Sequence, residues 1–207
     1  MPSESVRTLG VVFDASLTMS DQVTSLCQSL NFHLYNISRV RRMLTEEACS
    51  HAVRSLVLSR LDYANYLLMN VNVTDIHRLQ RIQNRAARIV LKARKYDRAS
   101  PLLTQLHWLP VKKRIVYKIA LLVFKCIHNL APGYLSHLLN IRQQSRYNLR
   151  SRGDALLLHI PRISSKKGEQ SSDFCGPTVW NSLPVQVRTC TSVEAFKRNL
   201  KSYLFSL

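Results

Sequence analysis

A set of basic residues in the middle of the chain recurs at spacings of three and four: Arg78, Arg81, Arg85, Arg88 and Lys92. In an α-helix this spacing places the side chains on one face. We therefore expect a helix over about residues 75–94, with its cations spread along about 21 Å at the usual helical rise. Guanidinium and ammonium groups in such a row can bind successive phosphates of a nucleic-acid backbone.

The alternative is a helix face that is merely solvated. Solvated faces normally mix charges of both signs, because like charges three or four residues apart repel each other. No acidic residue occurs between Arg78 and Lys95. The buried side of this helix is predicted by an apolar set with the same period: Leu79, Ile82, Ala86, Ile89 and Ala93. The pattern favours a phosphate-binding face.

The net charge of +18 is distributed unevenly along the chain. Residues 1–77 hold 6 basic and 7 acidic side chains, whereas residues 78–207 hold 24 and 5. This asymmetry favours a polyanionic partner, RNA or DNA rather than a membrane surface. Tyr147 is a weaker candidate for stacking on bases, and Trp108 and Trp180 are expected in the core. Further basic residues complete the candidate nucleic-acid-binding set: Arg94, Lys95, Lys112, Lys113 and Arg114.

The spacing of the other reactive residues indicates no catalytic centre. Polymerases that use two metal ions need carboxylates brought together, but the aspartates here are scattered and no YADD-like turn occurs. The sequence contains no GxxxxGKS, GxGxxG, HExxH or GxSxG motif. Its 7 histidines and 5 cysteines lack metal-ligand spacing, so free thiols are expected. We expect no enzyme activity, no cofactor, no metal and no small-molecule substrate.

Three helices are expected to position the cationic row. Residues 6–14 are rich in β-forming types and predict one edge strand. Apolar residues at spacings of three and four predict a helix over residues 23–44. Thr45 is a suitable N-cap for a second helix that should extend to about Leu68. The helix over residues 75–94 is the third.

The remainder of the chain predicts a less regular region. We expect a short helix from Ser100 to His107, a longer helix ended by Pro132 and Gly133, and a short helix at 134–139. A loop should follow over 141–177, with a strand at 155–160. A capping box of Thr191 and Glu194 should open the final helix. The predicted fold is therefore mainly α: a strand and three-helix bundle over residues 1–98, then a smaller α+β region with a few short strands over 99–207.

The N-terminus shows no secretory signal pattern, and the longest wholly apolar run, residues 119–124, is far shorter than the roughly 20 residues that cross a bilayer. We expect an intracellular protein, nuclear or cytoplasmic, that is neither secreted nor membrane-spanning. The oligomeric state stays open.

Several blocks of the sequence, in order, resemble the region that follows the catalytic palm in LINE-type (non-LTR) retrotransposon reverse transcriptases. LGVVFDASLTMSDQV resembles the last strand near the palm, and SLVLSRLDYANYLL with RLQRIQNRAARIV resembles the thumb helices. LLTQLHWLPVKKRIVYKIALLVFKCIHNLAPGYL, GPTVWNSLPVQVR and FKRNLKSYLF resemble the C-terminal segment of that family.

This resemblance implies a thumb-like bundle that holds a template–primer duplex through its backbone, with that role falling on the row from Arg78 to Lys92. It also implies that the fingers, the palm with its metal-binding aspartates and the endonuclease of the family would precede residue 1. The cysteine–histidine knuckle of some relatives has no counterpart here. Two other interpretations stay open: a translated transposon relic without function, and a helical protein-interaction module that uses the leucine-rich helix over 23–44.

Overall fold

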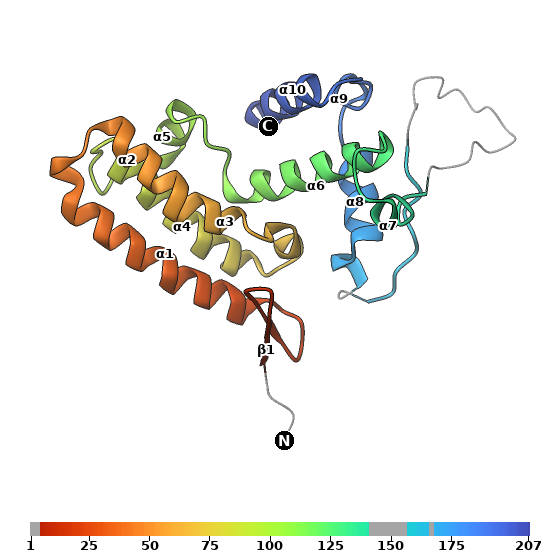
Figure 1. Ribbon diagram of the computed structural model, residues 1–207, viewed down its shortest axis with the longest axis horizontal. Coiled ribbons are helices and arrows are strands. Elements are labelled where there is room, and N and C mark those ends of the chain that lie inside the picture. The colour runs from red at the N-terminus through yellow and green to blue at the C-terminus, as the bar shows by residue number, and fades with distance from the viewer. Residues whose placement is uncertain (1–4, 141–156, 166–167) are drawn as a thin grey trace, which may run out of the picture. The chain divides into compact units, whose positions relative to one another are not determined.

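The computed structural model describes residues 5–140, 157–165 and 168–207. These residues are mainly helical, as expected, and their one sheet is a two-stranded hairpin near the N-terminus (Figure 1). The chain forms two compact units, Met1–Ile115 and Val116–Leu207, which divide within helix α6 (Val111–Ile127). This division lies later in the chain than the predicted boundary at residue 98. No helix in the described ranges is long and apolar enough to cross a membrane.

The N-terminal β region is a hairpin and not the single edge strand that the sequence predicted. Strands β1 (Ser5–Thr8) and β2 (Val11–Asp14) pair antiparallel, with Thr8 opposite Val11. The two residues between them both have positive φ angles, 49° at Leu9 and 81° at Gly10. Two consecutive left-handed residues match the twist of a tight hairpin turn, so the chain reverses there instead of continuing as one strand.

The carboxylate of Asp14 organises the turn between the hairpin and helix α1 (Ser20–Val40). Its Oδ1 accepts hydrogen bonds from the Ser16 and Thr18 amides at 3.1 and 2.9 Å, and Oδ2 accepts from the Met19 amide at 2.8 Å. Partial burial opposes ionisation, but the hydrogen bonds from Thr18, Ser16 and Met19 outweigh it and lower the pKa of Asp14 to about 2. The ionised side chain thus fixes the start of α1.

Helices α1 and α4 (Val73–Val90) run parallel and side by side in the first unit (Figure 1). Most of the apolar stripe of each helix is buried, as predicted, but Val40 is exposed and Ile89 is half-buried. Hydrogen bonds join them at three successive levels: Ser20 Oγ to Asp75 Oδ2 at 2.8 Å, Arg78 Nη2 to Thr24 Oγ1 at 3.1 Å, and Arg85 Nη1 to Asn31 Oδ1 at 3.3 Å. The offset between partners stays at 54 or 55 residues, so these bonds fix the register of the two helices.

The segment between α1 and α4 is broken where the sequence predicted one helix to Leu68. Thr45 caps α2 (Glu46–Val53) as predicted, with its side chain accepting from the Ala48 amide. A π-helical segment, Arg54–Leu58, and α3 (Ser59–Asp62) continue it, and then Ala64 turns left-handed at φ 49°. One positive φ interrupts the helical hydrogen-bond ladder, so only a separate 3-10 turn follows.

Three helices end in the same motif without a glycine. Lys92, His107 and Asn129 have φ angles of 52°, 54° and 56°, and the residue after each donates its amide to the carbonyl five residues back. These bonds are Ala93 N to Arg88 O at 3.0 Å, Trp108 N to Leu103 O at 2.8 Å, and Leu130 N to Lys125 O at 2.8 Å. This is the Schellman arrangement. It ends α4 at Val90, before the predicted residue 94, and α6 at Ile127, before the predicted Pro132 and Gly133.

The buried guanidinium of Arg41 joins the C-terminal ends of α1 and α4. Its Nε donates to the Ile89 carbonyl, Nη2 to the Val90 carbonyl and Nη1 to the Leu44 carbonyl, each at 2.7 Å. Ile89 and Val90 are the last residues of α4, where free carbonyls and the helix dipole create negative potential. Arg41 satisfies these carbonyls and holds both helix ends at one level.

The second unit is built around stacked aromatic rings. Phe124 of α6 stacks on Phe196 of α10 (Val193–Ser206) with ring centroids 4.2 Å apart, and Phe196 lies 5.9 Å from Trp180. Trp180 is buried, as predicted, in α8 (Ser172–Asn181). A Cβ at Gly176 of α8 would come within 3.1 Å of Val123, so the missing side chain lets α8 approach α6 closely. Two short helices, α7 (Gly133–Ser136) and α9 (Val185–Arg188), complete the unit.

Several predictions for the second unit were wrong. Residues 172–177, the end of the predicted loop, belong to α8, although Pro177 lies inside the helix. In the strand predicted at 155–160, of which residues 157–160 are described, only Leu158 has a bridge assignment. Its amide and carbonyl both pair with the Asn181 side chain of α8, at 2.9 and 2.8 Å. Ser192, not Thr191, caps α10 by accepting from the Ala195 amide.

Replacing Arg41 should destabilise the first unit. In Arg41→Ala the buried carbonyls of Leu44, Ile89 and Val90 lose their donors, so we expect a loss of about 2–4 kcal/mol in the free energy of unfolding. Arg41→Lys should recover only part of it, because an ammonium group lacks the planar fork. Urea denaturation measures this, with the exposed neighbour Arg42→Ala as control, expected within about 0.5 kcal/mol of wild type. Equal stability of Arg41→Ala and Arg42→Ala would contradict the proposed role of Arg41.

Asp14 should make stability depend on pH in acid. Because folding lowers the pKa of Asp14 from 3.8 to about 2, its stabilising contribution is complete above about pH 4 and is lost as pH falls towards 2. Asp14→Asn cannot titrate, so the difference in unfolding free energy between wild type and variant should shrink over that window. Urea denaturation at pH 5, 3 and 2 measures the difference. A difference that is constant with pH would mean that the charge of Asp14 plays no part.

Candidate nucleic-acid interface

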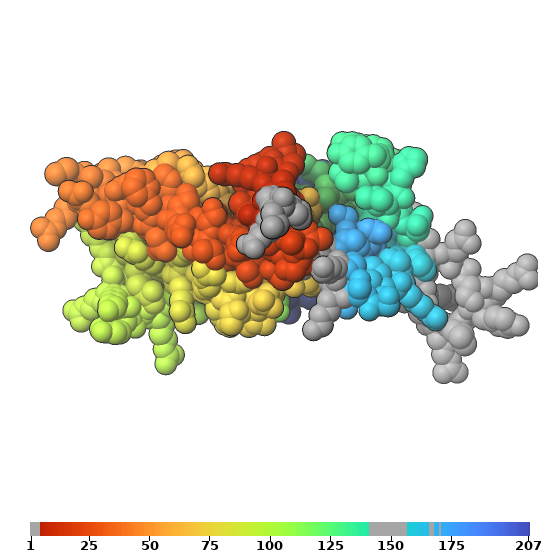
Figure 2. All heavy atoms as spheres, turned by 90° about the horizontal axis from the view of Figure 1, so that it is seen from below, coloured from red at the N-terminus to blue at the C-terminus, as the bar shows by residue number. Residues whose placement is uncertain are grey.

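A basic groove lies where the C-terminal ends of α1 and α4 meet. Its volume is about 700 Å³, and it is lined chiefly by Ser38 of α1, by Arg85, Arg88 and Ile89 of α4, and by Lys92 and Lys95 of the following loop. Arg41 also contributes to its wall. In Figure 2 the orange residues of α1 and the yellow and yellow-green residues of α4 and its following loop lie next to each other on one face of the first unit. None of the residues that line this groove is acidic.

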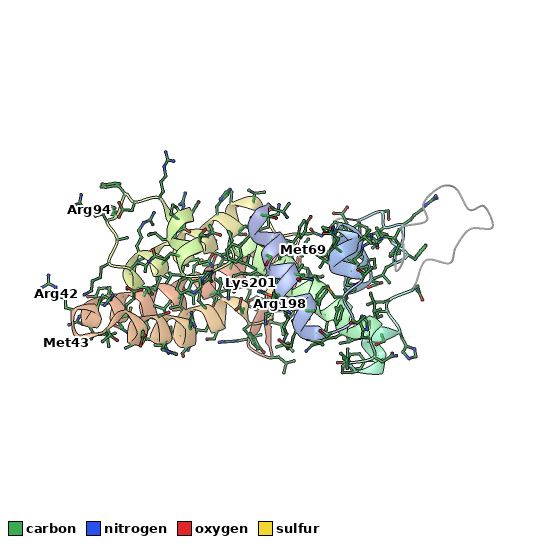
Figure 3. All side chains as sticks on the ribbon, turned by 90° about the horizontal axis from the view of Figure 1, so that it is seen from above. Arg42, Met43, Met69, Arg94, Arg198 and Lys201 are labelled. Carbon is green, nitrogen blue, oxygen red and sulfur yellow. The ribbon has the colours of Figure 1, made fainter. Side chains whose placement is uncertain are left out.

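The loop after α4 is held so that it presents its lysines beside the helix. Arg88 donates from Nε and Nη2 to the Asp97 carbonyl at 3.2 and 2.9 Å. The Asp97 carboxylate in turn accepts from the Arg94 amide at 2.6 Å. Figure 3 shows Arg94 and Arg42 at the same end of the first unit, with their side chains directed outward. This folded loop brings Lys92 and Lys95 to the groove although Lys92 lies beyond the end of the helix.

The predicted row of cations divides into two kinds. Arg78 forms an ion pair with Asp75 at 3.0 Å and bonds to Thr24, so it helps to hold α4 against α1. Arg85 bonds to Asn31 but still lines the groove. The side chains of Arg81 and Lys92 are exposed and form no ion pair or hydrogen bond with any residue that the structure describes. The outward members are therefore available to a ligand, whereas Arg78 is engaged within the protein.

The basic residues at the start of α6 also differ from one another. Lys112 is exposed and Lys113 half-buried, but Arg114 is paired with Asp62 of α3. Its Nε donates to Asp62 Oδ1 at 2.8 Å, and Nη2 donates to Oδ2. The planar guanidinium thus meets the carboxylate through both oxygens, a geometry that fixes α6 against α3. Arg114 was in the predicted binding set, and the structure gives it an intramolecular partner.

Two glutamines of α4 bond to the backbone at the start of α6 and were not identified from the sequence. Gln83 is fully buried and donates to the Leu109 carbonyl at 2.8 Å. Gln80 accepts from the Val111 amide at 2.8 Å, which satisfies a free donor at the start of α6, and it also donates to Gln83. Trp108, buried as predicted, precedes this contact. Glutamine on a basic helix gives no local signal of burial, which explains the omission.

The sequence also missed Ser38 and Arg41 as groove residues. Both lie in the nearly neutral part of the chain before residue 78, where the sequence shows no cluster of basic residues that would predict a binding site. Tyr147 lies outside the described residues, as do the arginines around it.

No three His, Cys, Asp or Glu side chains come together as a metal site within the described parts of the chain. All five cysteines are free thiols, as predicted. Burial, with a smaller contribution from the nearby acids Glu169 and Asp173, raises the pKa of Cys175 to about 11, so this thiol stays protonated at neutral pH.

Comparisons of the chain with models of known protein families, with curated proteins and with solved structures find no match.

Removing the Arg114–Asp62 pair should lower stability. Arg114→Met leaves the partly buried Asp62 carboxylate without its cation, so we expect the free energy of unfolding to fall by about 1–3 kcal/mol. Lys112→Met removes a similar charge from an exposed position and should change stability by less than about 0.5 kcal/mol. Thermal or urea unfolding compares the two variants. If both variants are as stable as the wild type, Arg114 is free to act as a ligand-binding residue after all.

Proposed function

We propose that the first unit binds the backbone of RNA or DNA without regard to sequence, through the groove and the outward cations of α4. The observation that carries the proposal is the groove itself, where Arg85, Arg88, Lys92 and Lys95 gather without an acidic side chain among the lining residues. Like charges held this close raise the free energy of the unliganded protein. A polyanion relieves that repulsion and releases its own counterions, so binding is favoured.

The dimensions of α4 suit a phosphate backbone. Arg81 and Arg88 are seven residues apart on the helix, which corresponds to about 10 Å, or about three base-pair steps along a duplex axis. Guanidinium groups bind phosphate oxygens in pairs, and lysines act as point charges beside them. Such contacts position a strand but carry no information on base identity. The proposed function therefore needs no catalytic group, cofactor or small-molecule substrate.

We further propose that the chain is a fragment related to the thumb and C-terminal segment of LINE-type retrotransposon reverse transcriptases. The sequence blocks that resemble this family support the proposal, and so does a helical first unit whose basic helix lies on its surface. A template–primer duplex is then one ligand that the groove could hold. Such a role is performed inside the cell, in the nucleus or cytoplasm.

The interpretation as a protein-interaction module receives less support. Its proposed groove was the leucine-rich stripe of α1, but Leu30 and Leu34 are fully buried within the first unit. The stripe is used in the unit's own core. Experiment can distinguish the proposed function from the interpretation as a relic without function. A relic is not expected to bind nucleic acid specifically through the groove.

A salt series tests the proposal. With Arg81, Arg85, Arg88, Lys92 and Lys95 each neutralising one phosphate, affinity for a mixed-sequence strand or duplex should fall with a log–log slope of about −4 against salt concentration. Filter binding or fluorescence anisotropy measures it for RNA, DNA and hybrid. Affinity that hardly changes between low and physiological salt would contradict backbone binding.

Charge reversal in the groove locates the site. Lys92→Glu combined with Lys95→Glu should weaken binding at least tenfold at physiological salt, because neither ammonium group has an ion pair in the described structure. The matched control, Lys112→Glu combined with Lys118→Glu, makes the same change in net charge at exposed positions of α6 and should weaken it much less. Circular dichroism checks that both variants stay helical. Equal losses in the two variants would show that net charge, and not the groove, governs binding.

A further inference from the structure

Two exposed tyrosines belong to elements that line the groove, each within three residues of a lining residue. Tyr35 lies one helical turn before Ser38, whose hydroxyl donates to the Tyr35 carbonyl at 2.7 Å. Tyr35 occupies the same flank of α1 as Asn31, the residue that bonds to Arg85 of α4. Tyr96 directly follows Lys95 in the loop after α4. Their exposed fractions are 55% and 88%, so both rings lie open to solvent beside the cations.

Each of the two rings is also next to a cation of its own element. The Arg39 guanidinium carbon lies 5.9 Å from the ring centroid of Tyr35, and Lys95 Nζ lies 5.6 Å from that of Tyr96. Within one helix turn or one loop, a cation can cover only one face of a ring. The other face stays available to a planar partner, and its burial against an apolar surface would be favourable.

We propose that this groove binds a strand with unpaired bases, with phosphates against its cations and bases stacked on Tyr35 and Tyr96. The inference rests on the proposed function and narrows it to single-stranded nucleic acid or the unpaired segment of a longer one. Bases inside a duplex already stack on one another and cannot reach these rings, whereas the bases of a single strand can. Stacking tolerates every base, because each has a flat aromatic face.

This arrangement combines the two features that general single-strand binding requires. A positively charged groove follows the backbone, and aromatic side chains at its margins receive the bases. The alternative is that the two pairs of ring and cation only stabilise α1 and the loop. That role would affect stability and would not depend on whether the ligand carries bases.

The experiment uses the full chain and three ligands of equal length: a single-stranded DNA of mixed sequence, the same backbone with abasic sites throughout, and a duplex. The variants are Tyr35→Leu, Tyr96→Leu and the double variant, each paired with the corresponding Phe variant, which keeps the ring. Tyr66→Leu is the matched control, because Tyr66 is also exposed but belongs to the 3-10 turn Asn65–Leu68, an element that contributes no residue to the groove lining. Fluorescence anisotropy at constant low salt gives the affinities.

We expect wild type to bind the base-containing strand at least tenfold more tightly than the abasic strand. Each Leu variant should lose about tenfold in affinity for the base-containing strand and little for the abasic strand or the duplex. The Phe variants and Tyr66→Leu should bind as wild type does.

Equal binding of base-containing and abasic strands by wild type would overturn the inference while leaving the proposed function intact. So would Leu variants that weaken all three ligands alike. Failure of every ligand to bind at low salt would reject both the inference and the proposed function.

Discussion

The guanidinium of Arg41 carries the interaction on which the described first unit depends. A buried guanidinium is costly unless its donors are satisfied, and here three backbone carbonyls at 2.7 Å satisfy them. Two of these carbonyls end α4, so α1 and α4 have to end at the same level. That alignment brings Ser38 beside Arg85 and Arg88 and creates the groove. The buried guanidinium of Arg41 thus fixes the geometry of the groove, and the lysines that line the groove remain exposed to solvent.

The cations of the chain serve two separate purposes. Arg78 and Arg114 neutralise Asp75 and Asp62 within the first unit. Two of the few acids of this unit are therefore already paired inside, and they do little to offset the charge of the groove. The exposed lysines Lys92 and Lys95 have no such ion pair among the described residues, so their charge is open to a ligand.

The groove differs from a helix face that carries cations alone, because the elements that form it also carry exposed aromatic rings. A row of arginines alone binds any polyanion by charge. Tyr35 and Tyr96 add flat aromatic surface beside the charge, on α1 and on the loop after α4. Each of these two elements carries one ring beside one cation, and the parallel packing of α1 against α4 adds the arginines of α4.

The sequence by itself determined the mainly helical fold, the buried stripes of α1 and α4, the Thr45 cap and the burial of Trp108 and Trp180, because period, capping chemistry and side-chain size act over a few residues. Only the tertiary structure decided where helices end and which cations are free. Left-handed Lys92, His107 and Asn129 end helices without a glycine. Asn181 pairs with the Leu158 backbone 23 residues away, and Arg41, Arg78 and Arg114 find partners about 50 residues away. Such pairings depend on how helices pack, and no local spacing encodes that packing.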